Sequence, residues 1–266
     1  MADIFHCNVR GIKTLDLRKG KVSVIQKILD EKGTVFTNLQ ETHLAYESEI
    51  PKVWTHLKDI YYIVFCRAIS TDPGSGIIVF VRKTEKILEK QILFEGRLLH
   101  IKTENLVSGE VLNFFSLYGK SNVGRNYASE IIEKMNSKIE SQNLENLIIC
   151  GDFNFVTSIN DRNTDRYTQT DLVYKDIWTH FEIKNNTIDT FRNLYPKRRL
   201  YTFSQTGGNS KSRIDRIYFS GDLVGRLQSL VFENYQCFDH KLLKLRIKNK
   251  IETGPGTWIF NCNLLK

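Results

Sequence analysis

The stretch Leu147–Val156 reads LIICGDFNFV and joins a run of apolar residues to an acid and an amide. Four apolar residues lead into Gly151, and Asp152, Phe153 and Asn154 follow. Residues two apart on a strand project from the same face. We therefore expect Asp152 and Asn154 to point the same way, with Phe153 packed behind them. A buried strand that ends in this way predicts a functional site at its end.

Outward from this stretch, apolar periodicity predicts alternating strands and helices. Helices are expected within residues 19–33 and 125–142. Strands are expected within residues 3–11, 34–43, 75–83, 98–105, 111–120, 145–154, 200–220 and 229–248. This order favours an α/β protein (α+β by some schemes) built as a four-layered α/β sandwich, in which two packed β-sheets are flanked by helices. Periodicity alone fits a single doubly wound sheet as well.

The composition indicates one basic domain. The chain has 266 residues, 41% of them hydrophobic, and a formal net charge of +8. That length supports one large core, and the charge is typical of proteins that bind nucleic acid or another polyanion. We expect one domain over residues 1–250 and a linker over residues 251–266, where Gly254, Pro255 and Gly256 break regular structure.

The cysteines and the apolar runs indicate the cellular setting. The five cysteines are scattered and form no CxxC pair. No signal peptide precedes the first predicted strand, and no apolar run approaches the length of a membrane span. We therefore expect reduced cysteines, no zinc site, no membrane association and an intracellular location.

Polar side chains recur near the ends of the predicted strands. They are Asn8, Glu41, Tyr118, Asp152, Asn154, Asp215, Asp239 and His240. Ligands of α/β sheets gather at the carboxyl ends of strands, so these side chains are expected to converge. Hard oxygen donors suit Mg²⁺, and a histidine oriented by a carboxylate can transfer protons or stabilise developing charge. The set predicts metal-assisted hydrolysis of a phosphodiester.

The same residues also have ordinary interpretations. A single Asp or Asn at the end of a strand is more often a turn former than a catalyst, and Tyr118 also fits a core position. His43 is interpreted as a neighbour of Glu41 without a catalytic role. The remaining histidines are interpreted as satisfied or exposed residues, namely His6, His56, His100 and His180. The order and spacing of the polar set along the chain favour a site.

The order of these motifs resembles the exonuclease–endonuclease–phosphatase superfamily. The motifs are NVRG at 8–11, QET at 40–42, Tyr118, GDFN at 151–154, SRID at 212–215 and DH at 239–240, and the likeness spans roughly residues 3–248. Within the superfamily, residues 152–162, 195–217 and 257–265 are similar to endonucleases of non-LTR (LINE-type) retrotransposons of the L-type clade, including the Tx type.

The resemblance implies a metal site and an activated water. By matching positions, Glu41 would ligate the metal and Asp239 would lie near it. Asn8 would hold phosphate or support the metal shell, and Asp152 would orient or activate the attacking water. The implied metal is Mg²⁺, with Mn²⁺ as an alternative.

The resemblance also implies groups that face the phosphate. Asn154 would hold it or support the metal shell, and Tyr118 would donate a hydrogen bond to it. His240 would face the phosphate, with Asp215 paired to its other ring nitrogen. One departure is informative: Arg10 follows Asn8 by two residues, where abasic-site repair enzymes of the superfamily carry an acid. Phe238 stands where serine is usual, and the proline that commonly follows the tyrosine is missing.

A hairpin and its flanks are predicted to contact DNA. Arg162, Thr202 and Ser212 match superfamily positions near the DNA backbone. The turn SQTGGNSKS at residues 204–212 suits a two-stranded ribbon that enters a groove and senses DNA shape, although a plain solvent loop is the alternative. The turn residues and the basic residues beside them are Gly207, Gly208, Asn209, Lys211 and Arg213.

These features predict a Mg²⁺-dependent endonuclease that nicks double-stranded DNA to start target-primed reverse transcription and integration of a non-LTR retrotransposon. The resemblance implies a reverse transcriptase domain and element RNA as partners in a longer protein, beyond the linker at 251–266, and a nuclear site of action. Two alternatives remain at this point. One is a phosphatase acting on inositol phosphates or phospholipids, and the other is a DNA-binding module that has lost catalysis.

Overall fold

The fold is seen in a computed structural model that describes residues 2–12, 20–31, 33–205 and 209–248. The predicted linker at 251–266 and the turn glycines Gly207 and Gly208 lie outside the described residues. Within the described ranges, no helix combines the length and the apolar character needed to cross a membrane.

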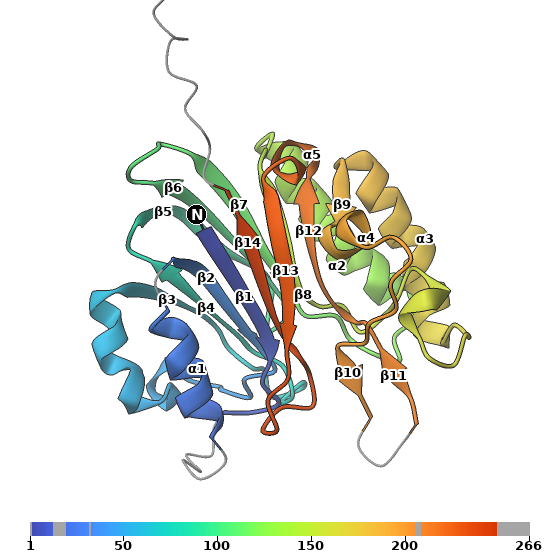
Figure 1. The fold of residues 1–266 in the computed structure, drawn as a ribbon, viewed down its shortest axis with the longest axis horizontal. Coiled ribbons are helices and arrows are strands. Elements are labelled where there is room, and N and C mark those ends of the chain that lie inside the picture. Colours follow the sequence, from blue (N-terminus) through green and yellow to red (C-terminus); the bar gives the residue numbers. More distant parts are fainter. Residues whose placement is uncertain (1, 13–19, 32, 206–208, 249–266) are drawn as a thin grey trace, which may run out of the picture.

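Two six-stranded sheets form the centre of the molecule (Figure 1). The first has the order β13-β14-β1-β2-β4-β3, with β1 and β2 parallel and the other described pairs antiparallel. Its strands are β1 (Ala2–Asn8), β2 (Thr34–Gln40), β3 (Tyr61–Cys66), β4 (Ile77–Arg82), β13 (Leu227–Glu233) and β14 (Leu242–Ile247).

The second sheet has the order β5-β6-β7-β8-β12-β9, with β7 and β8 parallel and the other described pairs antiparallel. Its strands are β5 (Glu85–Phe94), β6 (Leu98–Asn105), β7 (Val111–Leu117), β8 (Leu147–Asp152), β9 (Thr187–Asp189) and β12 (Asp215–Ser220). Strands β3, β5 and β9 were not predicted from the sequence.

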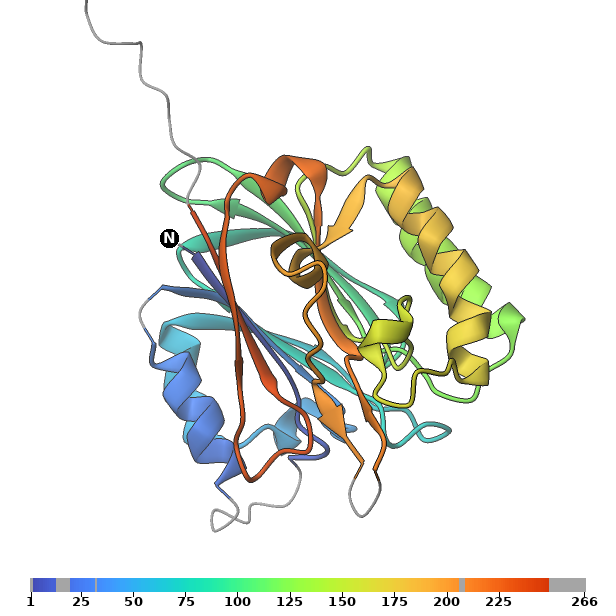
Figure 2. The ribbon, with the colours of Figure 1, turned by 45° about the vertical axis from the view of Figure 1, so that its right-hand side comes forward.

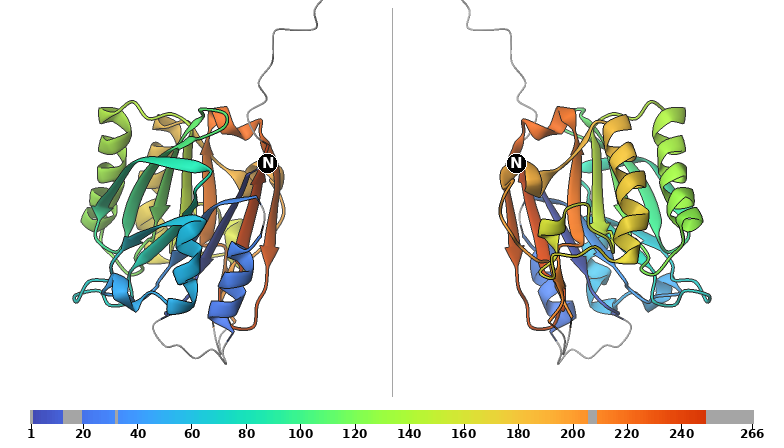
Figure 3. Two further views of the ribbon diagram at one scale, coloured as in Figure 1. Left: turned by 90° about the vertical axis from the view of Figure 1, so that its left-hand side faces the viewer. Right: turned by 90° about the vertical axis from the view of Figure 1, so that its right-hand side faces the viewer.

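Helices cover the outer faces of the two sheets. Helix α1 (Lys21–Leu29) lies on one side of the strands, and α2 (Arg125–Ser141) and α3 (Gln169–Lys184) lie on the other (Figures 1 and 2). Side views show the strands between these helical layers (Figure 3). The four-layered sandwich is confirmed, and the single doubly wound sheet is excluded.

The core between the sheets explains why the central strands are almost wholly apolar. Every residue of β2 and of β8 is buried, because each strand is covered on both faces. Phe36 of β2 stacks on Phe114 of β7 with ring centroids 4.7 Å apart, so the two sheets pack directly on each other. Burial of a side chain of this kind contributes about 1.5–3 kcal/mol.

The hydrophobic cores on the outer faces of the sheets are closed by the apolar faces of helices. The two predicted helices are confirmed as α1 and α2, and each buries its apolar face. Helix α3 was not predicted, although Thr168 and Asp171 form a capping box at its start. Its Trp178 packs edge-on against Phe153, at 4.9 Å between ring centroids. Shorter helical segments are η2 (Glu47–Glu49), η3 (Lys52–Asp59), η4 (Ile159–Asp161), α4 (Thr190–Leu194) and α5 (Gly221–Val224).

The predicted hairpin exists as a separate two-stranded ribbon. Its strands are β10 (Phe203–Ser204) and β11 (Lys211–Ser212), which pair antiparallel. The ribbon lies below the second sheet in Figure 1, beyond the start of β12. The strand-like run at residues 200–220 therefore divides into the ribbon and a longer strand of the sheet.

Candidate active site

The ends of strands from both sheets meet at one edge of the sandwich. Nδ2 of Asn8, at the end of β1, lies 2.9 Å from Oε2 of Glu41 and 2.9 Å from Oδ2 of Asp152. Tyr118 follows β7, and its hydroxyl donates to Oε2 of Glu41 at 3.0 Å. The predicted convergence of these four residues is confirmed.

Gly151 lets the opening motif approach the neighbouring strand. A Cβ at this position would lie 1.9 Å from the carbonyl oxygen of Leu117 on β7, closer than any side chain can be placed. Phe153 is fully buried in the aromatic cluster behind the site, as predicted. The glycine therefore lets the end of β8 lie close to β7, and Asp152 at that end meets Asn8 of the facing sheet at 2.9 Å.

Asn154 reaches the site by a different route from the one predicted. Strand β8 ends at Asp152, and Asn154 has a left-handed backbone with φ of 57°. The alternation rule for strands therefore does not apply to it, which corrects our argument. Its backbone N–H donates to Oδ1 of Asp152 at 2.9 Å, and its Nδ2 donates to the carbonyl of Gly119 at 3.0 Å. Asn154 orients Asp152 and closes the loop that carries Tyr118.

Glu41 is a carboxylate held in its ionised form. Burial opposes ionisation, but hydrogen bonds from His43, Asn8 and Tyr118 outweigh it and lower the pKa of Glu41. Nε2 of His43 lies 3.3 Å from Oε1, so both oxygens of Glu41 have a partner. The backbone of Glu41 itself is left-handed, with φ of 57°. The residue is turned out of strand geometry toward the opposite sheet.

Tyr118 is a fixed hydrogen-bond donor. Burial, followed by the charges of Asp152 and Glu41, raises the pKa of Tyr118 well above its usual range. The guanidinium of Arg97 stacks over its ring, 4.1 Å from the centroid, and donates to the carbonyl of Gly119 at 2.8 Å. The phenol therefore stays protonated and points at Glu41. Its predicted bond to a phosphate remains a prediction.

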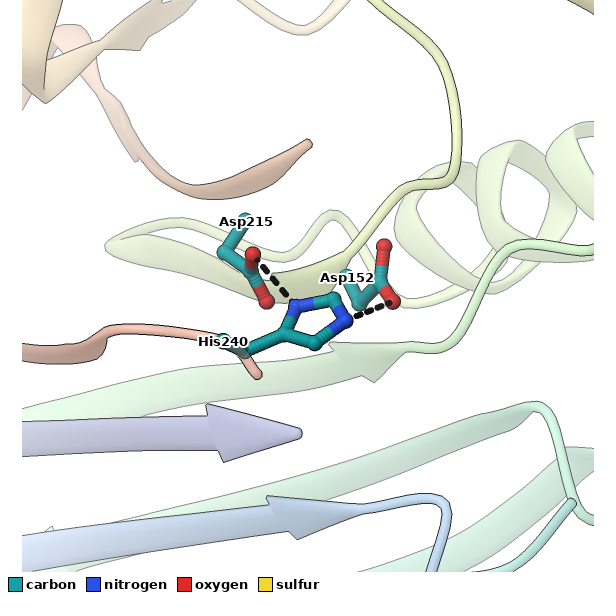
Figure 4. Close-up of side chains that lie close together, drawn as sticks. All are labelled: Asp152, Asp215 and His240. Carbon is teal, nitrogen blue, oxygen red and sulfur yellow. Dashed lines mark hydrogen bonds and ion pairs between the residues drawn. The ribbon is translucent and has the colours of Figure 1, made fainter. Parts of the chain in front are cut away.

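Asp215 and His240 form the predicted pair. Nδ1 of His240 lies 2.8 Å from Oδ2 of Asp215, and Nε2 faces Oδ2 of Asp152 at 4.0 Å (Figure 4). Burial opposes the charges, but attraction between the partners raises the pKa of His240 to about 9 and holds that of Asp215 well below its usual range. Burial and the charge of Asp215 raise the pKa of Asp152 to about 6.

The positions of Asp215 and His240 in the sheets differ from our expectation. Asp215 begins β12, which runs antiparallel to β8 and pairs Asp215 with Asp152. His240 likewise precedes β14 and does not end a strand. An antiparallel strand brings its first residue to the edge where its neighbour ends. The two residues therefore reach the site through antiparallel pairing.

Asp239 and Asn8, which the resemblance places beside the metal, both have partners within the protein. Nη1 of Arg10 lies 2.8 Å from Oδ2 of Asp239, so this carboxylate already has a cationic partner. Oδ1 of Asn8 accepts the backbone N–H of Arg10 at 3.1 Å, while its Nδ2 faces Glu41 and Asp152. Asn8 thus presents its amide donor to two carboxylates, as a residue that supports a metal shell would do. The structure assigns it the role of aligning them.

The remaining donors fit a hard divalent cation. Arg10 pairs with Asp239, and His240 pairs with Asp215. Among the described residues, Nε2 of His240 is the one cationic nitrogen within 4 Å of the Asp152 carboxylate, and it lies 4.0 Å from Oδ2. Glu41 has three hydrogen-bonding partners and Asp152 has two, and a carboxylate offers about four lone-pair sites, so both retain a free lone pair. Glu41 and Asp152 would hold the cation, which also relieves the excess negative charge. Asp152, Asp215 and His240 also lie close enough together to share an ion.

Two residues predicted to contact DNA are buried arginines. Arg162 forms a bidentate ion pair with Asp171, at 2.6 and 2.8 Å. Arg213 is 1% exposed and bridges Asp161 and Asp189. Both guanidinium groups are engaged inside the protein, so the prediction of direct DNA contact is corrected. The two ion pairs hold the base of the ribbon. Removal of one partner of a buried ion pair lowers the stability of a protein by about 3–5 kcal/mol.

Thr202 and Ser212 also support the site from inside. Oγ1 of Thr202 accepts the backbone N–H groups of Ile214 and Asp215, at 3.2 and 3.1 Å. Ser212 is buried on β11. Thr202 thus fixes the approach of the chain to Asp215, and it also lines a cavity beside the site. The assignment of Thr202 and Ser212 as DNA contacts stays a prediction. Of the residues predicted at the hairpin, Asn209 and Lys211 are exposed, and Gly207 and Gly208 lie outside the described residues.

Sequence reasoning missed several buried polar residues beside the site. His6, Asn38, Gln40 and Ser116 are all fully buried. His6 lies 3.1 Å from Asp215, although it was interpreted as an ordinary histidine. The signal for it was the alternation of β1, since His6 and Asn8 are two residues apart and share a face.

The site contains more carboxylates than fixed cations, and one of the carboxylates holds an imidazole. A site of this kind can bind a metal ion and hydrolyse a phosphodiester. The fold and the site thus define the class of metal-dependent phosphodiester hydrolases. The chain belongs to the endonuclease/exonuclease/phosphatase family, whose sequence profile matches residues 6–240. The resemblance found in the motifs is confirmed.

The chain is similar to one known protein in sequence and to several solved structures in fold. The chain is 28% identical over 247 residues to a 149 kDa protein of transposon TX1 from Xenopus laevis, covering 91% of this chain and 18% of that protein. The AP endonuclease LMAP from Leishmania major matches with a TM-score of 0.74 at 16% identity, over 93% of this chain and 88% of that one. The endonuclease domain of TRAS1, a telomere-specific non-LTR retrotransposon, matches with a TM-score of 0.65 at 11% identity, over 94% and 100%. The two structures show the shared fold.

Proposed function

We propose that this chain is a Mg²⁺-dependent endonuclease that nicks double-stranded target DNA and thereby starts target-primed reverse transcription of a non-LTR retrotransposon. The observation that carries the proposal is the similarity to the transposon TX1 protein along 91% of the chain. The chain spans 18% of that protein. In the proposal, residues 1–250 form the nuclease domain and residues 251–266 form the linker. The partners of the nuclease in the longer protein are a reverse transcriptase domain and element RNA, and the protein acts in the nucleus.

The geometry supplies the groups for hydrolysis. Asp152 is placed to accept the proton of the attacking water, because burial raises its pKa to about 6. His240 presents Nε2 beside Asp152, while Asp215 holds the other ring nitrogen. In this arrangement the imidazolium stabilises charge that develops on the phosphate. A divalent cation held by Glu41 and Asp152 would supply Lewis-acid polarisation of the phosphate.

A basic cavity beside the site suits a DNA backbone. It has a volume of about 560 Å³ and is lined in part by Arg10, Lys21, Lys241, Ser204 and Asn234. Asp239 also lines it and is paired with Arg10. Lys241 is placed to neutralise a phosphate beside the scissile bond, and such a contact steepens the salt dependence of binding. The ammonium of Lys21 donates to the backbone carbonyls of residues 9–11, so it adds positive potential to the cavity from a fixed position.

Supercoiled plasmid distinguishes the candidate functions. The proposed endonuclease converts it to the nicked circle with Mg²⁺ present. A phosphatase would leave the plasmid intact and release phosphate from inositol polyphosphates, and an inactive module would shift the plasmid on a gel without nicking it. Phosphate release without nicking would overturn the proposal.

Abasic DNA tests the choice within the family. We expect similar cleavage of an intact duplex and of the same duplex with one abasic site, because Arg10 occupies the position of the repair-type acid and pairs with Asp239. Initial rates on the two labelled duplexes measure this ratio. A preference of about 10²-fold or more for the abasic duplex would assign the chain to repair.

The pH profile of nicking is expected to be bell-shaped. Activity should fall in alkali as His240 loses its proton, with a pKa of about 9, and fall in acid as Asp152 gains a proton. The pKa of Asp152 is about 6 without a metal, and a bound cation lowers it, so the acid limb should lie below pH 6 when Mg²⁺ is present. Initial rates at low DNA concentration between about pH 5 and pH 10 report both limbs. Asp215→Asn serves as the control for the upper limb, which should move to lower pH because the carboxylate that raises the pKa of His240 is lost. An upper limb unchanged in that variant would contradict the pairing.

The hairpin is expected to choose where the enzyme cuts. Asn209 and Lys211 are exposed, and β11 is tied to the preceding loop by Asn163, whose Oδ1 accepts the N–H of Lys211 at 2.7 Å. Replacing Gln205–Asn209 with a Gly-Ser turn of equal length should change the map of nicks on a long duplex while total cleavage survives. A matched replacement of Val107–Gly109 in the β6–β7 turn should change neither. An unchanged map would make the hairpin a solvent loop.

A further inference from the structure

A chain of buried polar side chains crosses the space between the two sheets behind the site. Its members are His6 on β1, Asn38 and Gln40 on β2, and Ser116 on β7, each fully buried. Burying polar groups among apolar ones costs free energy unless every group is paired. Apolar residues fill the neighbouring positions of this interface, so the polar chain is not needed to close the core.

A backbone amide sets the donor direction in the first half of this hydrogen-bond chain. The N–H of Asp152 can only donate, and it lies 2.8 Å from Oε1 of Gln40. The amide nitrogen of Gln40 therefore faces Oγ of Ser116, at 2.8 Å, and the hydroxyl of Ser116 donates to Oδ1 of Asn38, also at 2.8 Å. Each donor points away from Asp152.

The second half continues in the same direction. Nδ2 of Asn38 lies 3.4 Å from the carbonyl oxygen of Cys150, which can only accept, so the amide orientation is fixed independently. The same nitrogen lies 3.2 Å from Nδ1 of His6, which must then carry a lone pair. Nε2 of His6 consequently bears the proton and donates to Oδ1 of Asp215 at 3.1 Å.

We propose that His6 is a positioning residue for the Asp215–His240 pair: the one-way hydrogen-bond chain fixes its neutral Nε2–H tautomer, and that N–H locks the Asp215 carboxylate in the orientation that receives Nδ1–H of His240. His6 holds Oδ1 and His240 holds Oδ2, so rotation of the carboxylate would break both bonds. The ring of His240 is then held with Nε2 toward Asp152. The effect on catalysis rests on the proposed endonuclease function, whereas the positioning itself does not.

Ring nitrogen spectra of the wild-type protein test the tautomer of His6. In a long-range ¹H–¹⁵N spectrum of the uniformly labelled protein, His6 should show a protonated Nε2 and an unprotonated Nδ1. His6→Gln assigns the signals by their disappearance. A protonated Nδ1 on His6 would overturn the proposal, because the ring would then clash with the donor of Asn38.

Matched substitutions test the positioning. His6→Leu removes the donor and His6→Gln keeps an N–H at about the same reach. The low-field Nδ1–H signal of His240 should shift or broaden in His6→Leu and be retained in His6→Gln. His100→Leu is the control, since His100 is another buried histidine bonded to an amide oxygen, that of Asn113. An unchanged His240 signal in folded His6→Leu would refute the proposal.

Kinetics provide the second readout. His6→Leu should lower kcat by about 10–100-fold with KM little changed, the range typical of side chains that orient site residues without touching substrate. His6→Gln should recover most of this loss. Equal losses in His6→Leu and His6→Gln would overturn the positioning role. If the wild type fails to nick DNA while the His240 signal still responds to His6→Leu, the proposed function fails and the positioning stands.

Discussion

Asp152→Ala and His240→Ala are each expected to lower the rate of plasmid nicking by at least about 10³-fold. Asp152 is a buried carboxylate whose Oδ2 lies 4.0 Å from Nε2 of His240, where it can accept a proton from water. Its removal eliminates proton acceptance from water, and removal of His240 eliminates a positive charge aimed at the phosphate. First-order nicking rates with Mg²⁺ in excess measure both losses.

The fold should survive these substitutions, because neither side chain belongs to the three apolar cores. Thermal melting followed by circular dichroism tests this directly. The matched controls are the exposed residues Asp59 and His180, whose alanine variants should nick at the wild-type rate. The effects of the two site variants should not add in the double mutant, because groups that act as a unit lose their effect together. Near-normal nicking by both folded variants would refute the assignment.

Chelation of divalent metal is expected to abolish nicking, and Glu41→Gln is expected to raise the Mg²⁺ concentration needed for half-maximal activity by at least about tenfold. The Glu41 carboxylate is held ionised by three hydrogen bonds. A neutral amide of the same shape binds a hard cation less well. Titrations with Mg²⁺ and with Mn²⁺ at fixed DNA measure the shift.

A binding measurement separates metal affinity from catalysis. A ligand that binds the folded state raises its melting temperature, so Mg²⁺ or Mn²⁺ should stabilise the wild type more than Glu41→Gln. Glu47→Gln, on the exposed segment η2, is the control and should behave as the wild type. Undiminished hydrolysis in excess EDTA would rule out the mechanism, and equal melting shifts in Glu41→Gln and the wild type would exclude Glu41 as a ligand.

Much of the site could be predicted from the sequence because its residues follow central strands. Asn8, Glu41 and Asp152 each come at or just after the end of a buried run, and parallel neighbours end at the same edge. The pairing of Asp215 with His240 was implied by the family resemblance and is seen in the structure. The catalytic and metal-binding roles of these residues stay predictions until the variants are measured.

The misplaced residues share a physical cause. Arg162 matches a superfamily position near the DNA backbone, and Arg213 is a basic residue beside the hairpin, so both were expected to meet DNA. Both instead meet carboxylates inside the protein, Asp171 in one case and Asp161 with Asp189 in the other. Charge in a sequence does not reveal whether its partner is another residue of the chain or a ligand.

Local patterns in the chain are enough to assign α1, α2 and the central strands, and to place an acid at the end of β8. Periods of two and of about 3.6 residues depend on neighbours a few positions apart, so they survive in the linear sequence. The partner of each polar group depends on strand order and register. His6 and Asp215 are separated by 209 positions and meet at 3.1 Å because the end of β1 and the start of β12 lie at the same edge of two facing sheets. No periodicity encodes that meeting, since it arises only when both sheets are assembled and the apolar layer between them is closed.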